Sequence, residues 1–159
     1  MPITTEELRA ISQRAEALHR RSREVLTAGV RRAAREGYTQ RQIAAAIGRS
    51  QPEVARLLRF VPRGYHGRRL ATHRRDVLDL ASQQGVTNVR VFGSTARGTE
   101  GPESDIDLLV DVAPDVGLFG LARLEIALSE LLGLPVDVVP ASSLRDRIAE
   151  DVLNEAVPL

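Results

Sequence analysis

The chain has 159 residues, of which 43% are apolar and 3% aromatic, and it contains no cysteine. This composition excludes disulfide bonds and cysteine-ligated zinc, and it predicts a soluble globular protein with an aliphatic core. No apolar run is long enough to span a membrane and the acidic start is unlike a signal peptide, so we expect a cytoplasmic protein without membrane contact.

Charge is distributed unevenly along the chain. Residues 1–75 contain 17 Arg and 6 Glu, a net charge of +11, whereas residues 76–159 carry a net charge of −10 within an overall charge of +1. The asymmetry predicts two functional halves, of which the basic one is a candidate for polyanion binding. All 22 basic residues are Arg, which indicates a compositional bias, so arginine alone is not evidence of phosphate contact.

A long helical segment opens the first half. Thr4 and Glu7 have the spacing of a capping box, and apolar residues then recur at helical intervals. We expect one long helix or two consecutive helices over 5–36, ended by Gly37. The stripe departs from a strict heptad, so it does not support a long coiled coil.

Two short helices should follow, over 40–47 and 51–60, separated by a turn at Gly48. Thr39 and Ser50 are the expected N-caps. The apolar positions of both helices fit a helix-turn-helix, which would bind DNA through residues near the start of the second helix. The residues expected to contact bases are Arg49, Ser50, Gln51, Glu53 and Arg56. The alternative is a small helical bundle that uses a solvated basic face for protein contacts or dimerisation.

The expected domain limits follow from composition. Residues 1–60 would form the all-α helix-turn-helix domain, residues 61–69 a Pro/Gly/Arg-rich linker, and residues 70–159 a second domain. The three histidines are too scattered for a metal site and are expected at the surface.

The second half alternates helices and strands, which predicts an α/β (α+β) domain. The expected helices cover 70–84 and 118–132, with a last helix from Ser142 or Ser143 to about residue 156. The expected strands cover 89–92, 106–112 and 136–139.

Two motifs in this half carry chemistry. Gly93-Ser94 follows a strand, where backbone N–H groups and a hydroxyl suit nucleotide phosphates, and Arg97 could add charged contacts to them. Asp105 and Asp107 lie two residues apart at the start of a strand, so both carboxylates project from one face and could share Mg²⁺ ions. Asp111, farther along that face, is expected to be a solvated strand end.

Asp137 is the lone acid of an otherwise apolar strand, where burial without a partner would be costly. If its strand neighbours the one that carries Asp107, the three carboxylates complete a two-metal site for phosphoryl chemistry. The alternative is that these residues form no site, and that a solvent-exposed Asp-x-Asp segment happens to lie beside a Gly-Ser turn.

Gly93-Ser94, the Asp-x-Asp ten residues later and the third strand acid together resemble the minimal nucleotidyltransferases of the polymerase-β-like superfamily. The resemblance covers the second half and includes Arg97-Gly98, Ser104 and the terminal residues 155–159. It implies a small mixed sheet with flanking helices. It also implies that Asp105 and Asp107 bind two Mg²⁺ ions, that Asp137 binds the catalytic ion and helps activate the acceptor hydroxyl, and that Gly93 and Ser94 hold the triphosphate of ATP.

The resemblance further implies a toxin–antitoxin function. Minimal nucleotidyltransferases are commonly antitoxins that transfer AMP to a tyrosine of a HEPN-type ribonuclease toxin, and a helix-turn-helix would suit binding to operator DNA. A symmetric operator would require a homodimer, with the Leu8, Ile11 and Leu18 stripe as the expected interface unless that stripe is intramolecular core. Two alternatives remain: a toxin that modifies tRNA, and a DNA-binding regulator with a non-catalytic transferase fold.

Overall fold

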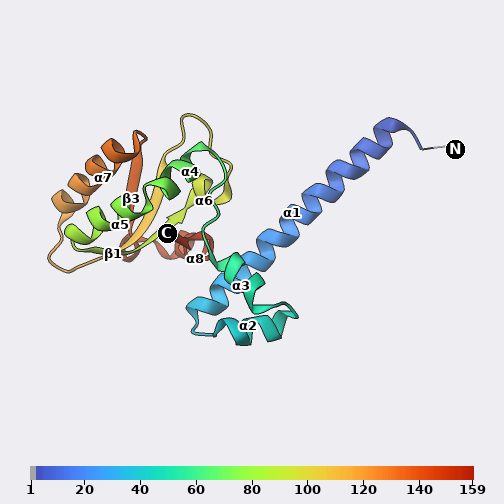
Figure 1. Cartoon of the computed structure of the whole chain (residues 1–159), viewed down its shortest axis with the longest axis horizontal. Helices are drawn as coiled ribbons and strands as arrows, with labels where there is room; N and C mark the ends of the chain where they lie inside the picture. Colours follow the sequence, from blue (N-terminus) through green and yellow to red (C-terminus); the bar gives the residue numbers. More distant parts are fainter. Residues whose placement is uncertain (1–2) are drawn as a thin grey trace. The chain divides into compact units, whose positions relative to one another are not determined.

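The computed structural model describes residues 3–159, and the chain divides into two compact units after Leu57. The first unit is helical and the second combines helices with a sheet (Figure 1). No helix of residues 3–159 is both long enough and apolar enough to cross a membrane.

The first unit begins with one continuous helix, α1 (Thr5–Arg35). The expected capping box is present: Glu7 N donates to Thr4 Oγ1 at 3.1 Å and Thr4 N donates to the Glu7 carboxylate at 2.7 Å. Val30 is the only residue of α1 that is fully buried. Leu8, Ile11 and Leu18 are each more than half exposed, so the apolar stripe is not intramolecular core.

Two short helices, α2 (Gln40–Ile47) and α3 (Gln51–Leu58), follow at the expected positions. Gly48 separates them in the left-handed conformation, with φ of 65°. Buried Ile43, Ala44 and Val54 come from both helices. The second helix ends at Leu58, two residues earlier than expected.

The second unit opens with α4 (Tyr65–Thr72) and α5 (Arg74–Gln83), which break at His73. The linker was expected over residues 61–69, but residues 65–69 belong to α4. Gly67 signals close packing here, because a Cβ on it would lie 3.3 Å from Pro62 Cα. His66, expected at the surface, is 2% exposed.

The sheet has four strands in the order β3-β2-β1-β4: β1 (Val86–Phe92), β2 (Ile106–Val112), β3 (Val136–Pro140) and β4 (Val157–Pro158). The β1 strand is antiparallel to β2 and β4, whereas β2 and β3 are parallel. The expected mixed sheet is therefore confirmed, although the short β4 strand was not anticipated.

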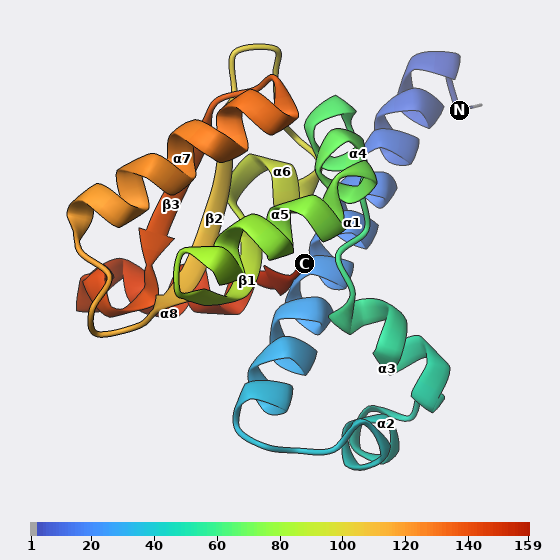
Figure 2. The same ribbon diagram turned by 60° about the vertical axis from the view of Figure 1, so that its left-hand side comes forward.

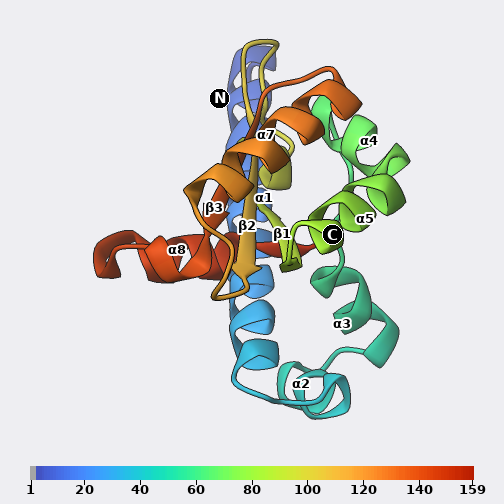
Figure 3. The ribbon, with the colours of Figure 1, turned by 90° about the vertical axis from the view of Figure 1, so that its left-hand side faces the viewer.

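Helices lie on both sides of this sheet. The α5 helix and α7 (Leu118–Leu132) lie side by side over one face (Figure 2). The α8 helix (Asp146–Glu155) lies on the other side (Figure 3). The core between α5, α7 and the sheet is aliphatic, as the composition predicts, and its fully buried members include Leu70, Val77, Val91, Leu108, Leu124, Leu128 and Leu132.

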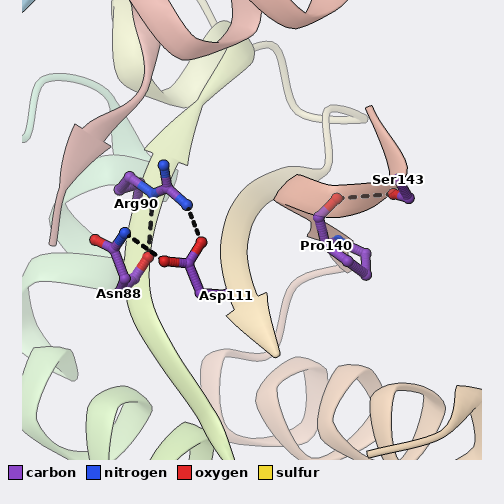
Figure 4. A network of polar contacts seen from close by, with 5 residues as sticks. All are labelled: Asn88, Arg90, Asp111, Pro140 and Ser143. Atoms are coloured by element: carbon purple, nitrogen blue, oxygen red, sulfur yellow. Dashed lines mark hydrogen bonds and ion pairs between the residues drawn. The ribbon is translucent and has the colours of Figure 1, made fainter. Parts of the chain in front are cut away.

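A polar cluster marks an irregularity in β1, where the register with β2 shifts between Thr87 and Arg90. Asn88 has a φ of 50° there, and its amide donates to Asp111 at 2.8 Å. Arg90 forms an ion pair with the same carboxylate at 2.7 Å (Figure 4). Asp111 is thus held by two partners and is not simply a solvated strand end.

The last helix begins later than expected. Ser143 belongs to the short 3₁₀ turn η1 (Ala141–Ser143), where its hydroxyl donates to the Pro140 carbonyl at 2.8 Å (Figure 4). Leu144 and Arg145 are extended, so α8 starts at Asp146 and neither serine is its N-cap.

Candidate active site

The sheet register places two of the expected acids side by side. Asp107 lies in β2 and Asp137 in β3, and they are direct partners in the parallel pairing. Residues opposite one another on neighbouring strands share a face and lie about 5 Å apart. Asp105 immediately precedes β2, two residues from Asp107. The fold therefore gathers Asp105, Asp107 and Asp137 in one part of one face.

Gly93, which follows β1, lies directly against the Asp107 carboxylate. Phe92, the last residue of β1, pairs with Asp107, and Gly93 follows with a φ of 68°. A Cβ on Gly93 would lie 2.4 Å from Asp107 Oδ2. Glycine is required here for its backbone conformation and for the close approach of the carboxylate.

Ser94 and Arg97 belong to the one-turn helix α6 (Gly93–Arg97) that begins at this glycine. Gly98 ends α6 in the left-handed conformation, and its N–H bonds to the Ser94 carbonyl. Ser94 is half-buried and Arg97 is exposed. The Gly-Ser motif and the Asp-x-Asp motif are thereby brought to the same place.

The loop between α6 and β2 is fixed at two points. Ser104 Oγ accepts a hydrogen bond from Gly101 N at 2.9 Å, which closes the turn just before Asp105. Glu100 accepts a bond from Gly67 N at 3.4 Å, which ties the loop to α4. Glu100 was not anticipated, because no sequence pattern links it to a helix 33 residues away.

The electrostatics of the site are those of crowded carboxylates. Burial raises the pKa of Asp107, and the nearby charges of Asp137 and Asp105 raise it further. Glu155, at the end of α8, acts in the same direction, whereas Arg97 opposes the shift. Arg97 is itself paired with Glu155. Glu155 was part of the family resemblance, but sequence alone assigned it no role.

The donor set fits divalent cations, because carboxylate oxygens are the ligands that Mg²⁺ prefers. Mutual repulsion at Asp107 is also the condition that a bound cation would relieve. Within residues 3–159 no three His, Asp or Glu side chains already form a group that could hold a metal ion.

The residues expected to contact DNA separate into two kinds. Gln51 and Arg56 on α3 are exposed. Glu53, in contrast, accepts hydrogen bonds from Ser50 N at 2.9 Å and Ser50 Oγ at 2.7 Å, and it lies 3.5 Å from Arg49. These bonds to Ser50 lower the pKa of Glu53. The S-x-x-E spacing is a capping-box signal that could have revealed this structural task.

Comparison with known proteins identifies the same family that the sequence motifs resemble. Residues 70–159 match the family model of the nucleotidyltransferase domain. The chain is 42% identical over 88 residues to the protein adenylyltransferase MntA of Thermococcus cleftensis, which covers 55% of this chain and 86% of that protein. It is 37% identical over 84 residues to a proposed protein adenylyltransferase of Methanocaldococcus jannaschii, covering 53% and 90% of the two chains.

A solved structure of a proposed minimal nucleotidyltransferase is also similar. It shares 47% sequence identity with this chain at a TM-score of 0.53, and the match covers 57% of this chain and 92% of that one. The family model, these relatives and the small mixed sheet agree. The chain belongs to the nucleotidyltransferase domain family and is a nucleotidyltransferase of the minimal type.

Proposed function

We propose that this enzyme transfers AMP from ATP to a hydroxyl group of a partner protein, using Mg²⁺. The main support for this proposal is the register of β2 and β3, in which Asp137 is the direct partner of Asp107. Gly93 in addition lies against the Asp107 carboxylate. The two relatives named for protein adenylyl transfer support the choice of donor and acceptor class.

The chemistry assigns a task to each residue. Gly93 and Ser94 bind the triphosphate through backbone N–H groups and the hydroxyl, and Arg97 adds positive charge once it leaves Glu155. Asp105 and Asp107 would hold two Mg²⁺ ions, and Asp137 one of them. Bound Mg²⁺ supplies charge stabilisation for the phosphoryl oxygens. Asp137 helps remove the proton of the acceptor hydroxyl, whose oxygen bonds to the α-phosphorus as pyrophosphate leaves.

The acceptor we propose is a tyrosine of a HEPN-type ribonuclease toxin, for which this chain would be the antitoxin. Support comes from the resemblance to the minimal nucleotidyltransferases, in which that pairing is common. The test is to incubate the chain with ATP, Mg²⁺ and the product of the adjacent gene, and to locate the AMP group by mass spectrometry.

The expected result is AMP on a tyrosine of the partner, lost with Asp105→Ala. An unmodified partner would remove the protein-modification claim. Transfer of the nucleotide to tRNA, with growth arrest on overexpression that Asp105→Ala relieves, would instead favour a toxin.

We further propose that α2 and α3 bind operator DNA. The support is the +11 charge of residues 1–75, the Gly48 turn, the burial of Ile43, Ala44 and Val54, and the exposure of Gln51 and Arg56 on α3. A dimer on a symmetric operator would have the exposed stripe of α1 available as its interface.

A further inference from the structure

The β3 strand lies at the edge of the sheet, with β2 as its only neighbour among residues 3–159. An edge strand presents N–H groups on its outer side that no strand pairs. In β3 these belong to alternate residues, Val136 and Val138, which flank Asp137. Unless something accepts their hydrogen bonds, the backbone around Asp137 is held from one side alone.

Two side chains of α7 accept those bonds. Ser129 Oγ accepts from Val136 N at 3.1 Å, and Glu125 Oε1 accepts from Val138 N at 3.0 Å. The two acceptors are four residues apart and therefore lie on one face of the helix. Both are half-buried, and α7 lies alongside β3 (Figure 2).

The helix that carries these acceptors is itself firmly anchored. Leu124, Leu128 and Leu132 of α7 are each 1% exposed within the core. The C-terminal end of α7 is tied to α4 through Arg69 Nε, which donates to the Leu132 carbonyl at 2.8 Å. Glu125 and Ser129 therefore project from a fixed platform toward β3.

Asp137 depends on its backbone for its position. Its side chain is exposed, so packing does not orient it, whereas its strand is held by β2 on one edge and by Glu125 and Ser129 on the other. The two α7 acceptors bond to the residues immediately before and after it. A shift of β3 away from β2 would separate the carboxylates of Asp137 and Asp107.

We propose that Glu125 and Ser129 are positioning residues for metal binding, which fix Asp137 at its distance from Asp107. The inference rests on the proposed function, because it requires that these aspartates bind divalent ions. It adds that the α7 helix, which contributes no ligand, sets the geometry of the site. Residues that orient metal ligands commonly change metal affinity by about 10–100-fold when they are replaced.

The test compares Mn²⁺ affinity, measured by electron paramagnetic resonance in the presence of ATP, between variants that keep or lose the bond acceptor. Ser129→Ala and Glu125→Ala remove an acceptor and should each weaken Mn²⁺ binding about tenfold. Ser129→Thr and Glu125→Gln retain an acceptor oxygen and should stay within about twofold of the parent chain.

Leu128→Val separates positioning from stability. It trims a fully buried residue of the same helix and lowers its stability, but it leaves both acceptors in place. Its melting temperature should fall while its Mn²⁺ affinity stays unchanged. If Leu128→Val weakened Mn²⁺ binding as much as Ser129→Ala does, the proposal would be overturned. It would also be overturned if Glu125→Gln bound Mn²⁺ as weakly as Glu125→Ala, because the charge of Glu125 and not its hydrogen bond would then determine the affinity.

Failure of the proposed function is distinguishable from failure of this inference. If the parent chain does not bind Mn²⁺ with ATP, or Asp137→Asn binds it equally well, the metal site itself is wrong. If the parent chain binds Mn²⁺, Asp137→Asn does not, and all acceptor variants match the parent chain, only the positioning role is wrong.

Discussion

At the scale of single residues, Gly93 is constrained both by its backbone conformation and by a neighbouring side chain. An alanine there would meet Asp107 Oδ2 and would have to adopt a φ of 68°. We predict that Gly93→Ala lowers nucleotidyl transfer at least about 100-fold and costs about 1–3 kcal/mol of stability. The measurements are pyrophosphate release and thermal unfolding.

Gly117 provides the matched control for that variant. It is a helix N-cap with a φ of −86°, and a Cβ on it would meet nothing within 4 Å. Gly117→Ala should keep full activity. If Gly93→Ala were equally active, the close contact with Asp107 would have no functional meaning.

The ionised Asp107 carboxylate should destabilise the folded protein in the absence of metal, because it is partly buried and lies near other carboxylates. A carboxyl whose pKa is raised in the folded state stabilises the fold at acidic pH, and this contribution is lost as the pH rises through that pKa. Asp107→Asn should therefore melt at a higher temperature than the parent chain near pH 7, by about 2–4 °C for each kcal/mol of repulsion relieved. Its advantage should shrink toward pH 4.

Addition of Mg²⁺ should make the parent chain melt at a higher temperature than Asp107→Asn, the reverse of the order expected without metal. It should raise the melting temperature of the parent chain and leave Asp107→Asn unchanged, since the ion needs the carboxylate. Asp115→Asn, in an exposed loop, is the control and should follow the parent chain at every pH. A parent chain more stable than Asp107→Asn at pH 7 without metal would refute the crowded-carboxylate account.

At the scale of elements, the two roles of α3 make distinct predictions. Gln51→Ala and Arg56→Ala should weaken binding to operator DNA by about 1–3 kcal/mol without loss of stability, because both side chains are exposed. Glu53→Ala should instead lower the melting temperature, since it removes the acceptor of the Ser50 bonds. Fluorescence anisotropy and thermal unfolding measure the two effects.

Arg14→Ala is the matched control for DNA binding, because Arg14 is an exposed arginine on α1 and lies outside the α2–α3 segment. It should change affinity much less than Arg56→Ala. Equal losses from both variants would indicate attraction by net charge and not recognition by α3.

The exposed stripe of α1 has its own test. Leu18→Glu places a charge at the C-terminal end of the stripe and should shift any dimer toward monomer in analytical ultracentrifugation, with the helix content unchanged. The control is Arg20→Glu on another face of the helix. A parent chain that is monomeric at all concentrations would exclude α1 as a dimer interface.

The elements with strong local signals were predictable from sequence. The Thr4 and Thr39 caps and the Gly48 turn are each local, and the structure has all three. The first residues of α4 were assigned to the linker because residues 61–69 are rich in Pro, Gly and Arg, whereas Gly67 allows close packing against Pro62. The β4 strand is two residues long and exists through its pairing with β1, which no local pattern reports.

For the candidate site, the residues could be predicted from the sequence, but their arrangement in space could not. The residue types and spacing named Gly93, Asp105, Asp107 and Asp137 as candidates, but only the fold shows that Asp107 and Asp137 are register partners. Glu125 and Ser129 could not be found from sequence, because a helical Glu or Ser is ordinarily a solvated residue. Their bonds to β3 depend on tertiary packing alone.

At the scale of the whole molecule, the two units carry opposite net charges: residues 1–57 hold 11 Arg and 6 Glu (+5), and residues 58–159 hold 11 Arg and 15 acids (−4). The basic unit carries the candidate DNA-binding helices, and the acidic unit carries the transferase fold. This division predicts separable functions. Asp105→Ala should abolish nucleotidyl transfer and leave operator binding intact, whereas Arg56→Ala should do the reverse.

The three aspartates should form a working site for AMP transfer to a protein, and ATP labelled at the α-phosphate or at the γ-phosphate tests this most directly. With Mg²⁺ and the product of the adjacent gene, label should reach the partner from the α-phosphate alone, and Asp137→Asn should lower the transfer at least about 100-fold. Transfer from γ-labelled ATP, or equal transfer by Asp137→Asn, would contradict it.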